Sequence, residues 1–154
     1  WDGWWHKGDM AANAGVGFSG GYWGWGFAVY PGFEFEVADW KIADTVPLSL
    51  GVSARGMIGI SDYYGTAFGV GPFVAAHMGF KGLDIPEFFQ KLDLYVALGL
   101  ALSFGSDLGG VSPVGFASYD GISYFVNDKV AIYLEGNYWG YYGGATLGVL
   151  FKLK

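Results

Sequence analysis

The sequence contains no cysteine and few charged residues, and both shortages narrow the class of protein. Without cysteine there is neither a disulfide framework nor a thiolate metal site. Charged residues make up 14% of the chain and the formal net charge is −6, so the basic surface that nucleic-acid binding requires is missing. We therefore expect no nucleic-acid partner.

Long apolar runs are also missing. No stretch reaches the ~18 consecutive apolar residues of a transmembrane helix. Nor does a basic segment lead into an apolar one, as in a secretion signal, so we expect the chain to be a mature form. Yet 53% of the residues are hydrophobic, 20% are aromatic and 28 of the 154 are glycine, which is far from ordinary globular usage.

A period of two explains this composition. Along residues 93–104, large apolar side chains alternate with Tyr, Ala, Gly and Ser. Since successive side chains of a strand point to opposite faces, the alternation predicts a strand. One face is apolar and bulky, while the other is small and mildly polar, as in the wall of a membrane-spanning barrel. The same split recurs over residues 10–19, 27–37, 46–60, 68–80, 130–138 and 144–153.

With the less regular stretch 114–126, the chain has eight predicted strands. Strands of about 9–11 residues cross a bilayer when tilted. An even number of strands closes into an antiparallel barrel without a free edge, which is the β structure that a bilayer tolerates. We predict an all-β fold, an eight-stranded antiparallel up-and-down transmembrane β-barrel, with residues 1–154 forming a single barrel domain.

The sixth strand admits two phases, which the length of the following turn decides. A two-residue loop at 127–128 turns Asp120 inward, opposite Glu135, and Tyr119 outward. If Lys129 joins the loop, the phase flips and Asp120 faces lipid. We favour the first phase, because a charge near the membrane midplane costs up to a few kcal/mol.

The connections between strands fall into two alternating classes. Those over residues 38–45, 81–93 and 127–128 carry Asp and Lys, whereas those over 19–25, 61–66, 105–113 and 138–144 are rich in glycine and aromatic residues. With an even number of strands, both termini share the end that bears the first class, which we assign to the periplasm. Residues 83–92 form either a short amphipathic helix on the headgroup surface or a plain long turn.

In strand number, length, alternation and the segment 124–135 (YFVNDKVAIYLE), the chain resembles the small eight-stranded outer-membrane barrels of Gram-negative bacteria, the OmpA and OmpX type. The resemblance covers essentially the whole chain. It implies an integral protein of the bacterial outer membrane, with the lipid bilayer as its first partner.

Polar residues on the predicted inward face form the first candidate site. Its members are Glu34, Glu36, Arg55, His77, Asp120 and Glu135. An eight-stranded barrel is just wide enough for side chains to fill, so we favour a packed ion-pair core over a proton relay or an ion path. Arg55 is the only arginine, and its planar fork can bridge to Glu34 or across the lumen to Glu135. We predict no metal site and no cofactor.

Aromatic residues at the ends of strands form the second candidate site. They are Trp23, Trp25, Tyr63, Tyr64, Tyr138, Trp139, Tyr141 and Tyr142. We favour an interfacial girdle at headgroup level, with Trp1, Trp4 and Trp5 as its periplasmic counterpart. The aromatic excess leaves open contacts with other envelope proteins or between copies of the chain.

Neither His6 nor His77 combines with a serine and a carboxylate in a recognisable triad order, so we expect no enzyme. We expect a structural, adhesive or surface-interaction role with a filled lumen, not an open porin. Two alternatives stay open. A self-assembling cell-surface or filament subunit would bury the same apolar face between copies. A soluble lipocalin-like carrier would turn that face inward around an apolar ligand.

Overall fold

The computed structural model describes residues 3–19, 26–62, 65–105, 113–140 and 143–154. Most of these residues are in strands. The elements in chain order are β1 (Met10–Ser19), β2 (Gly26–Ile42), β3 (Val46–Ser61), β4 (Gly65–Gly79), α1 (Glu87–Gln90), β5 (Leu92–Gly105), β6 (Val114–Asn127), β7 (Val130–Tyr138) and β8 (Gly143–Lys152). The described residues contain no helical segment that could span a bilayer.

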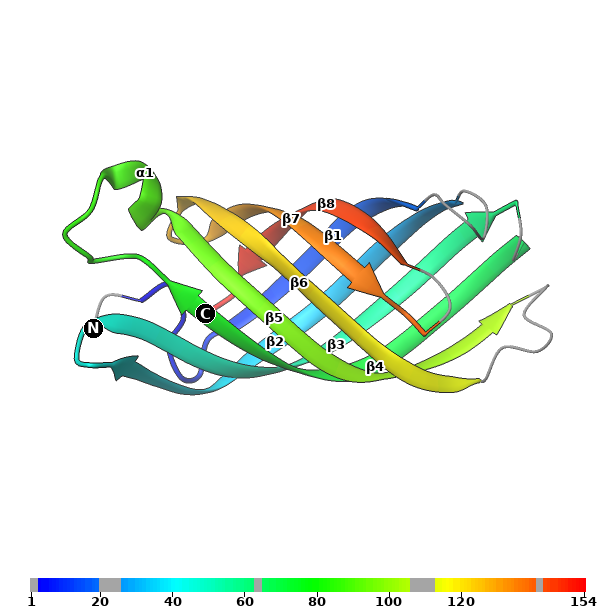
Figure 1. Cartoon of the computed structure of the whole chain (residues 1–154), viewed down its shortest axis with the longest axis horizontal. Coiled ribbons are helices and arrows are strands. Elements are labelled where there is room, and N and C mark those ends of the chain that lie inside the picture. Colours follow the sequence, from blue (N-terminus) through cyan, green and yellow to red (C-terminus); the bar gives the residue numbers. More distant parts are fainter. Residues whose placement is uncertain (1–2, 20–25, 63–64, 106–112, 141–142) are drawn as a thin grey trace.

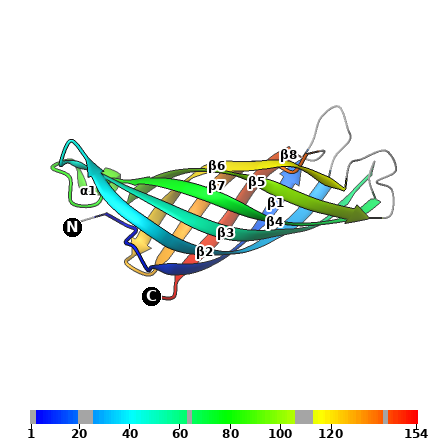
Figure 2. The same ribbon diagram turned by 90° about the horizontal axis from the view of Figure 1, so that it is seen from below.

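The eight strands form one closed antiparallel barrel in the order of the sequence, with β8 pairing back onto β1. This confirms the predicted up-and-down barrel. Figures 1 and 2 show an elongated, tilted barrel with both termini at the end that carries α1. The turns β2–β3 and β6–β7 lie at that same end, as the alternating connection classes predicted.

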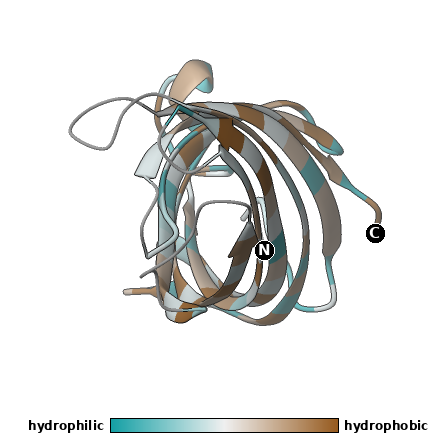
Figure 3. Cartoon of the chain, turned by 90° about the vertical axis from the view of Figure 1, so that its right-hand side faces the viewer, coloured by the Kyte–Doolittle hydropathy of each residue, from teal (hydrophilic) through white to brown (hydrophobic). Residues whose placement is uncertain are grey.

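Hydrophobic and more polar residues alternate along the strands (Figure 3), and the two faces of the wall follow this alternation. Large apolar side chains point outward and are exposed, as with Leu98, Leu100 and Leu134, each 56% exposed. The opposite face is buried in the lumen, where Ala97 and Ala131 are 1% and 0% exposed. Pairing of all eight strands satisfies the backbone groups, so the apolar outer face carries no open sheet edge.

Strand β6 takes the phase that we rejected, so the predicted inward position of Asp120 is wrong. Tyr119 is buried in the lumen and Asp120 is exposed on the outer face, opposite Gly136 rather than Glu135. The register shifts between Phe125 and Asn127, where β6 has one residue more than β7. Relative to the predicted register, such a bulge moves every side chain of β6 that precedes it to the other face.

The turn itself explains the shift. Asn127 Oδ1 accepts hydrogen bonds from the backbone N–H groups of Lys129 (2.9 Å) and Val130 (3.0 Å). This Asx turn places Asp128 and Lys129 at the tip and leaves Asn127 paired with Val130. The turn thus starts one residue later than predicted, and Val126 becomes the extra residue.

Two connections also differ in extent from the prediction. Strand β2 continues to Ile42, so most of the expected 38–45 link is paired with β3. In the 83–92 segment, α1 is a single turn whose Phe88 and Phe89 are 59% and 50% exposed. The segment combines the two alternatives, because α1 covers only four of its residues and residues 83–85 form bends.

Candidate functional site

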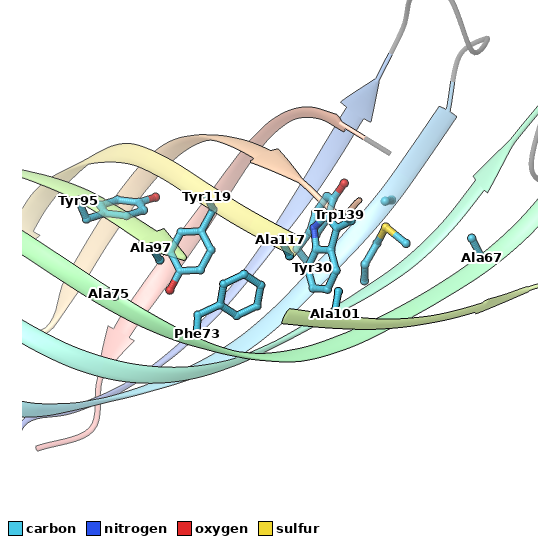
Figure 4. Close-up of a cluster of buried hydrophobic side chains, with 12 residues drawn as sticks. Tyr30, Ala67, Phe73, Ala75, Tyr95, Ala97, Ala101, Ala117, Tyr119 and Trp139 are labelled. Atoms are coloured by element: carbon cyan, nitrogen blue, oxygen red, sulfur yellow. The ribbon is translucent and has the colours of Figure 1, made fainter. Parts of the chain in front are cut away.

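The lumen farther from the termini is filled by aromatic rings (Figure 4). Tyr30, Phe73, Tyr119 and Trp139 are all at most 3% exposed. The Trp139 ring lies 5.7 Å from Phe73 edge-on and 6.3 Å from Tyr30 in a stacked arrangement. Phe73 in turn contacts Tyr119 at 5.1 Å. These rings occupy the space that an open channel would need.

Glycines on the inward face provide room for further rings. A Cβ atom at Gly121 would lie 2.6 Å from the Tyr95 hydroxyl, and one at Gly148 would collide with the Tyr133 ring. Tyr30, Phe73, Tyr95 and Tyr133 are all buried on the inward face of their strands. Glycine-rich inner faces therefore do not leave this lumen empty, because rings from other strands lie over them.

An ion pair spans the lumen near its middle. Arg55 Nη2 lies 3.3 Å from Glu135 Oε2, and both side chains are almost fully buried. The Tyr95 hydroxyl donates to the same oxygen at 3.0 Å, and the guanidinium lies 4.0 Å above the Tyr119 ring. Of the two partners considered for Arg55, the structure pairs it with Glu135 on β7.

His77 occupies the centre of a second polar cluster, nearer the termini. Its Nδ1 lies 2.7 Å from Asp93 Oδ2, and its Nε2 lies 2.7 Å from Glu34 Oε1 and 3.9 Å from Glu36 Oε1. Gly51 makes room for this approach, because a Cβ there would lie 2.6 Å from Glu36 Oε1. The imidazole of β4 thereby reaches across β3 to the carboxylates of β2.

The N-terminal segment closes the lumen between the His77 cluster and the barrel end that carries the termini. Trp5 Nε1 donates to Asp93 Oδ2 at 3.0 Å, and Trp4 stacks on Phe125 with 4.0 Å between ring centroids. Lys152 donates to the Trp4 carbonyl at 2.6 Å. The expected girdle position of Trp4 and Trp5 is wrong, since both indoles are buried inside the barrel end, 6% and 2% exposed.

Of the predicted polar cluster, the structure brings together Glu34, Glu36 and His77, and it pairs Arg55 with Glu135. Asp120 belongs to neither group. Asp93 was overlooked, although it is fully buried and is the direct partner of His77. Its position two residues before the inward Tyr95 is the sequence signal that indicates its direction.

The predicted aromatic site is described only in part. Tyr138 is exposed on the outer face, consistent with a girdle position, and its hydroxyl donates to the Gly140 carbonyl at 2.8 Å. Trp139 points inward, so its predicted girdle role is wrong. The remaining members, Trp23, Trp25, Tyr63, Tyr64, Tyr141 and Tyr142, lie outside the described residues.

At the end of the barrel, an ion pair joins the β4–β5 connection to the β6–β7 turn: Lys81 Nζ lies 2.7 Å from Asp128 Oδ1. This hydrogen bond lowers the pKa of the Asp128 carboxyl. Both side chains are exposed to solvent, so we expect the pair to add little stability.

No family model matches the sequence, and no curated protein matches it. Among the solved structures that share its fold are two small barrels. A de novo designed transmembrane β-barrel superposes with a TM-score of 0.53 at 15% identity, covering 97% of this chain and 98% of that one. The Yersinia pestis outer membrane protein Ail, solved in a phospholipid bilayer nanodisc, gives 0.51 at 14% identity, covering 96% and 100%. The chain therefore has the fold of small eight-stranded transmembrane barrels.

Proposed function

We propose that this chain is an integral outer-membrane barrel with a filled lumen, acting at the cell surface in a structural or adhesive role rather than as an enzyme or an open porin. The observation that carries the proposal is the composition of the closed wall. Bulky apolar side chains cover the outside, while the Arg55–Glu135 ion pair and the packed rings around it are inside. A bilayer is the environment that stabilises this arrangement, and water is not.

The same observation argues against a lipocalin-like carrier. A carrier needs an apolar cavity inside the barrel, whereas the inner face here carries Arg55, His77 and buried carboxylates among packed rings. A filament subunit would cover the apolar face with other copies instead of lipid. A membrane barrel inserts into a bilayer as a single chain, whereas a filament subunit does not, and this difference separates the two.

Refolding into lipid vesicles tests the proposal. We expect the chain to need detergent for extraction from cells, to insert into preformed phosphatidylcholine vesicles as a monomer, and to migrate faster on gels before boiling than after it. Vesicle-bound chain should resist protease along its strands. Recovery in the aqueous fraction without detergent, or assembly into pelletable filaments that do not bind vesicles, would refute it.

For the adhesive role, the support is the concentration of Trp and Tyr in the connections opposite the termini, since these residues dominate contact surfaces. Cells that display the chain should aggregate and sediment faster than cells carrying the double variant Trp23→Ser and Trp25→Ser at equal surface level. Equal sedimentation rates would contradict a role of these side chains in cell contact.

A further inference from the structure

Three buried side chains from two strands converge at one point of the lumen. Glu34 and Glu36 of β2 and His77 of β4 each offer a potential ligand atom, and these atoms all lie within 4.8 Å of one another. The three side chains are at most 3% exposed. One imidazole nitrogen and carboxylate oxygens at this spacing are a ligand set that divalent transition metals accept.

The Glu36 carboxylate is the member that points to a missing partner. It is fully buried, and neither of its oxygens has a hydrogen-bond partner. A buried carboxylate is costly to keep charged unless a cation or several donors compensate it. The nearest cationic candidate, the His77 Nε2, is 3.9 Å away and lies closer to Glu34.

The balance of buried charges also indicates that a cation is missing from this cluster. The buried ionisable side chains of the described residues include the carboxylates of Glu34, Glu36, Asp93 and Glu135. Against them stand Arg55, which is paired with Glu135, and His77. Even a protonated His77 leaves the cluster of Glu34, Glu36 and Asp93 with excess negative charge, which a divalent cation would neutralise.

The surroundings of His77 match those of a metal-binding histidine. Asp93 accepts from the Nδ1 side at 2.7 Å, and Trp5 Nε1 donates to the same carboxylate oxygen at 3.0 Å. Metal-binding histidines usually give their second ring N–H to a carboxylate, which fixes the tautomer and the ring orientation. With one proton held on Nδ1, a metal ion at Nε2 would take the place of the proton that joins Nε2 to Glu34 Oε1, which lie 2.7 Å apart.

We propose that Glu34, Glu36 and His77 bind one divalent transition-metal ion of the zinc class, with Asp93 and Trp5 as positioning residues. The mixed nitrogen and oxygen set favours zinc or cobalt over magnesium and calcium, which prefer oxygen ligands alone. Bound metal would join β2 to β4 across Gly51 and so couple metal binding to barrel stability. The proposal concerns the lumen and does not depend on the cellular location of the barrel.

Cobalt is the probe for the test, because its visible absorption reports nitrogen and oxygen ligation directly. The chain is refolded in detergent micelles with CoCl₂, passed over a desalting column and assayed for bound cobalt and for absorption bands. Metal is present during refolding because Trp4 and Trp5 close the nearer end of the lumen. We expect one cobalt per folded chain, displacement by zinc, and a higher unfolding temperature with either metal.

Matched variants locate the site, with folding checked by the heat-dependent gel shift. Glu36→Gln and His77→Gln should lose the absorption bands. His6→Gln removes the other of the two histidines, and Glu135→Gln removes a buried carboxylate outside the cluster; both should keep the bands. Asp93→Asn should weaken cobalt binding by about 10–100-fold while leaving the ligands in place.

The wild-type measurement decides the matter even if a variant does not fold. Cobalt below stoichiometric amounts in folded wild-type chain, with an unfolding temperature that zinc does not change, would overturn the proposal and leave a proton shared between His77 and the glutamates. Bands that persist in His77→Gln, or that vanish in His6→Gln, would overturn it too by placing the metal elsewhere.

Discussion

Removal of the Arg55 side chain tests whether the lumen is held by a buried ion pair. In Arg55→Ala, the Glu135 carboxylate keeps the Tyr95 hydrogen bond but loses its only guanidinium partner. Both side chains of the pair are at most 5% exposed, so water does not replace the lost partner. Breaking such a pair on one side costs about 3–5 kcal/mol.

The remaining Tyr95 hydrogen bond places the expected loss near the lower end of that range, about 3 kcal/mol. The guanidinium also lies over the Tyr119 ring, a contact that contributes about 0.5–2 kcal/mol. Against a typical stability of about 5–15 kcal/mol, the loss is large enough to measure with confidence.

The assay is equilibrium unfolding by urea from lipid vesicles, followed by tryptophan fluorescence in chelator-treated buffer. Glu135→Gln in the Arg55→Ala background removes the stranded charge and should recover about 2–3 kcal/mol as coupling between the two positions. Arg55→Met keeps most of the side-chain volume and separates the charge from the cavity. If Arg55→Ala unfolds at the urea concentration of the parent, the Arg55–Glu135 pair does not stabilise the barrel.

Three further predictions concern the wall and the lumen. Leu100→Arg should cost about 2–4 kcal/mol in vesicles because it places a charge on the outer face, whereas Ser106→Arg in the following connection should have little effect; equal effects would show that the outer face is wrongly assigned. Asp120→Leu should stabilise the barrel in vesicles by about 1–2 kcal/mol, since the carboxylate faces outward in the middle of β6. A lower stability of this variant would show instead that the Asp120 side chain points into the lumen. In planar bilayers the chain should show no uniform large conductance, because rings fill the lumen; steady porin-sized channels would contradict the filled lumen.

The sequence by itself determined the strands and the direction of most side chains. Alternation is a local property, because each strand residue points opposite to its neighbours whatever the rest of the chain does. Positions such as Leu134, outward, and Tyr133, inward, were therefore predictable from the period of two. Closure into a barrel followed from the apolar outer face. In a bilayer an open sheet edge would leave backbone N–H and C=O groups without partners, and eight antiparallel strands avoid such an edge by pairing the last strand with the first.

The exception in β6 shows where local reasoning ends. Its phase depends on one extra residue at Val126, which the Asx turn at Asn127 introduces. A shift of one residue reverses every side chain of β6 that precedes Val126, so Tyr119 and Asp120 exchange faces relative to the prediction. Alternation within β6 was too irregular to decide between the two phases.

Contacts across the lumen were decided only by the tertiary structure. Sequence reasoning placed Arg55 and His77 inward, but the stagger between non-adjacent strands determines that Arg55 meets Glu135 while His77 meets Glu34 and Asp93. The entry of Trp5 into the barrel end likewise has no periodic signal, since residues 3–7 form no strand. Distances between side chains on opposite walls depend on strand tilt and register around the whole barrel, which no single segment encodes.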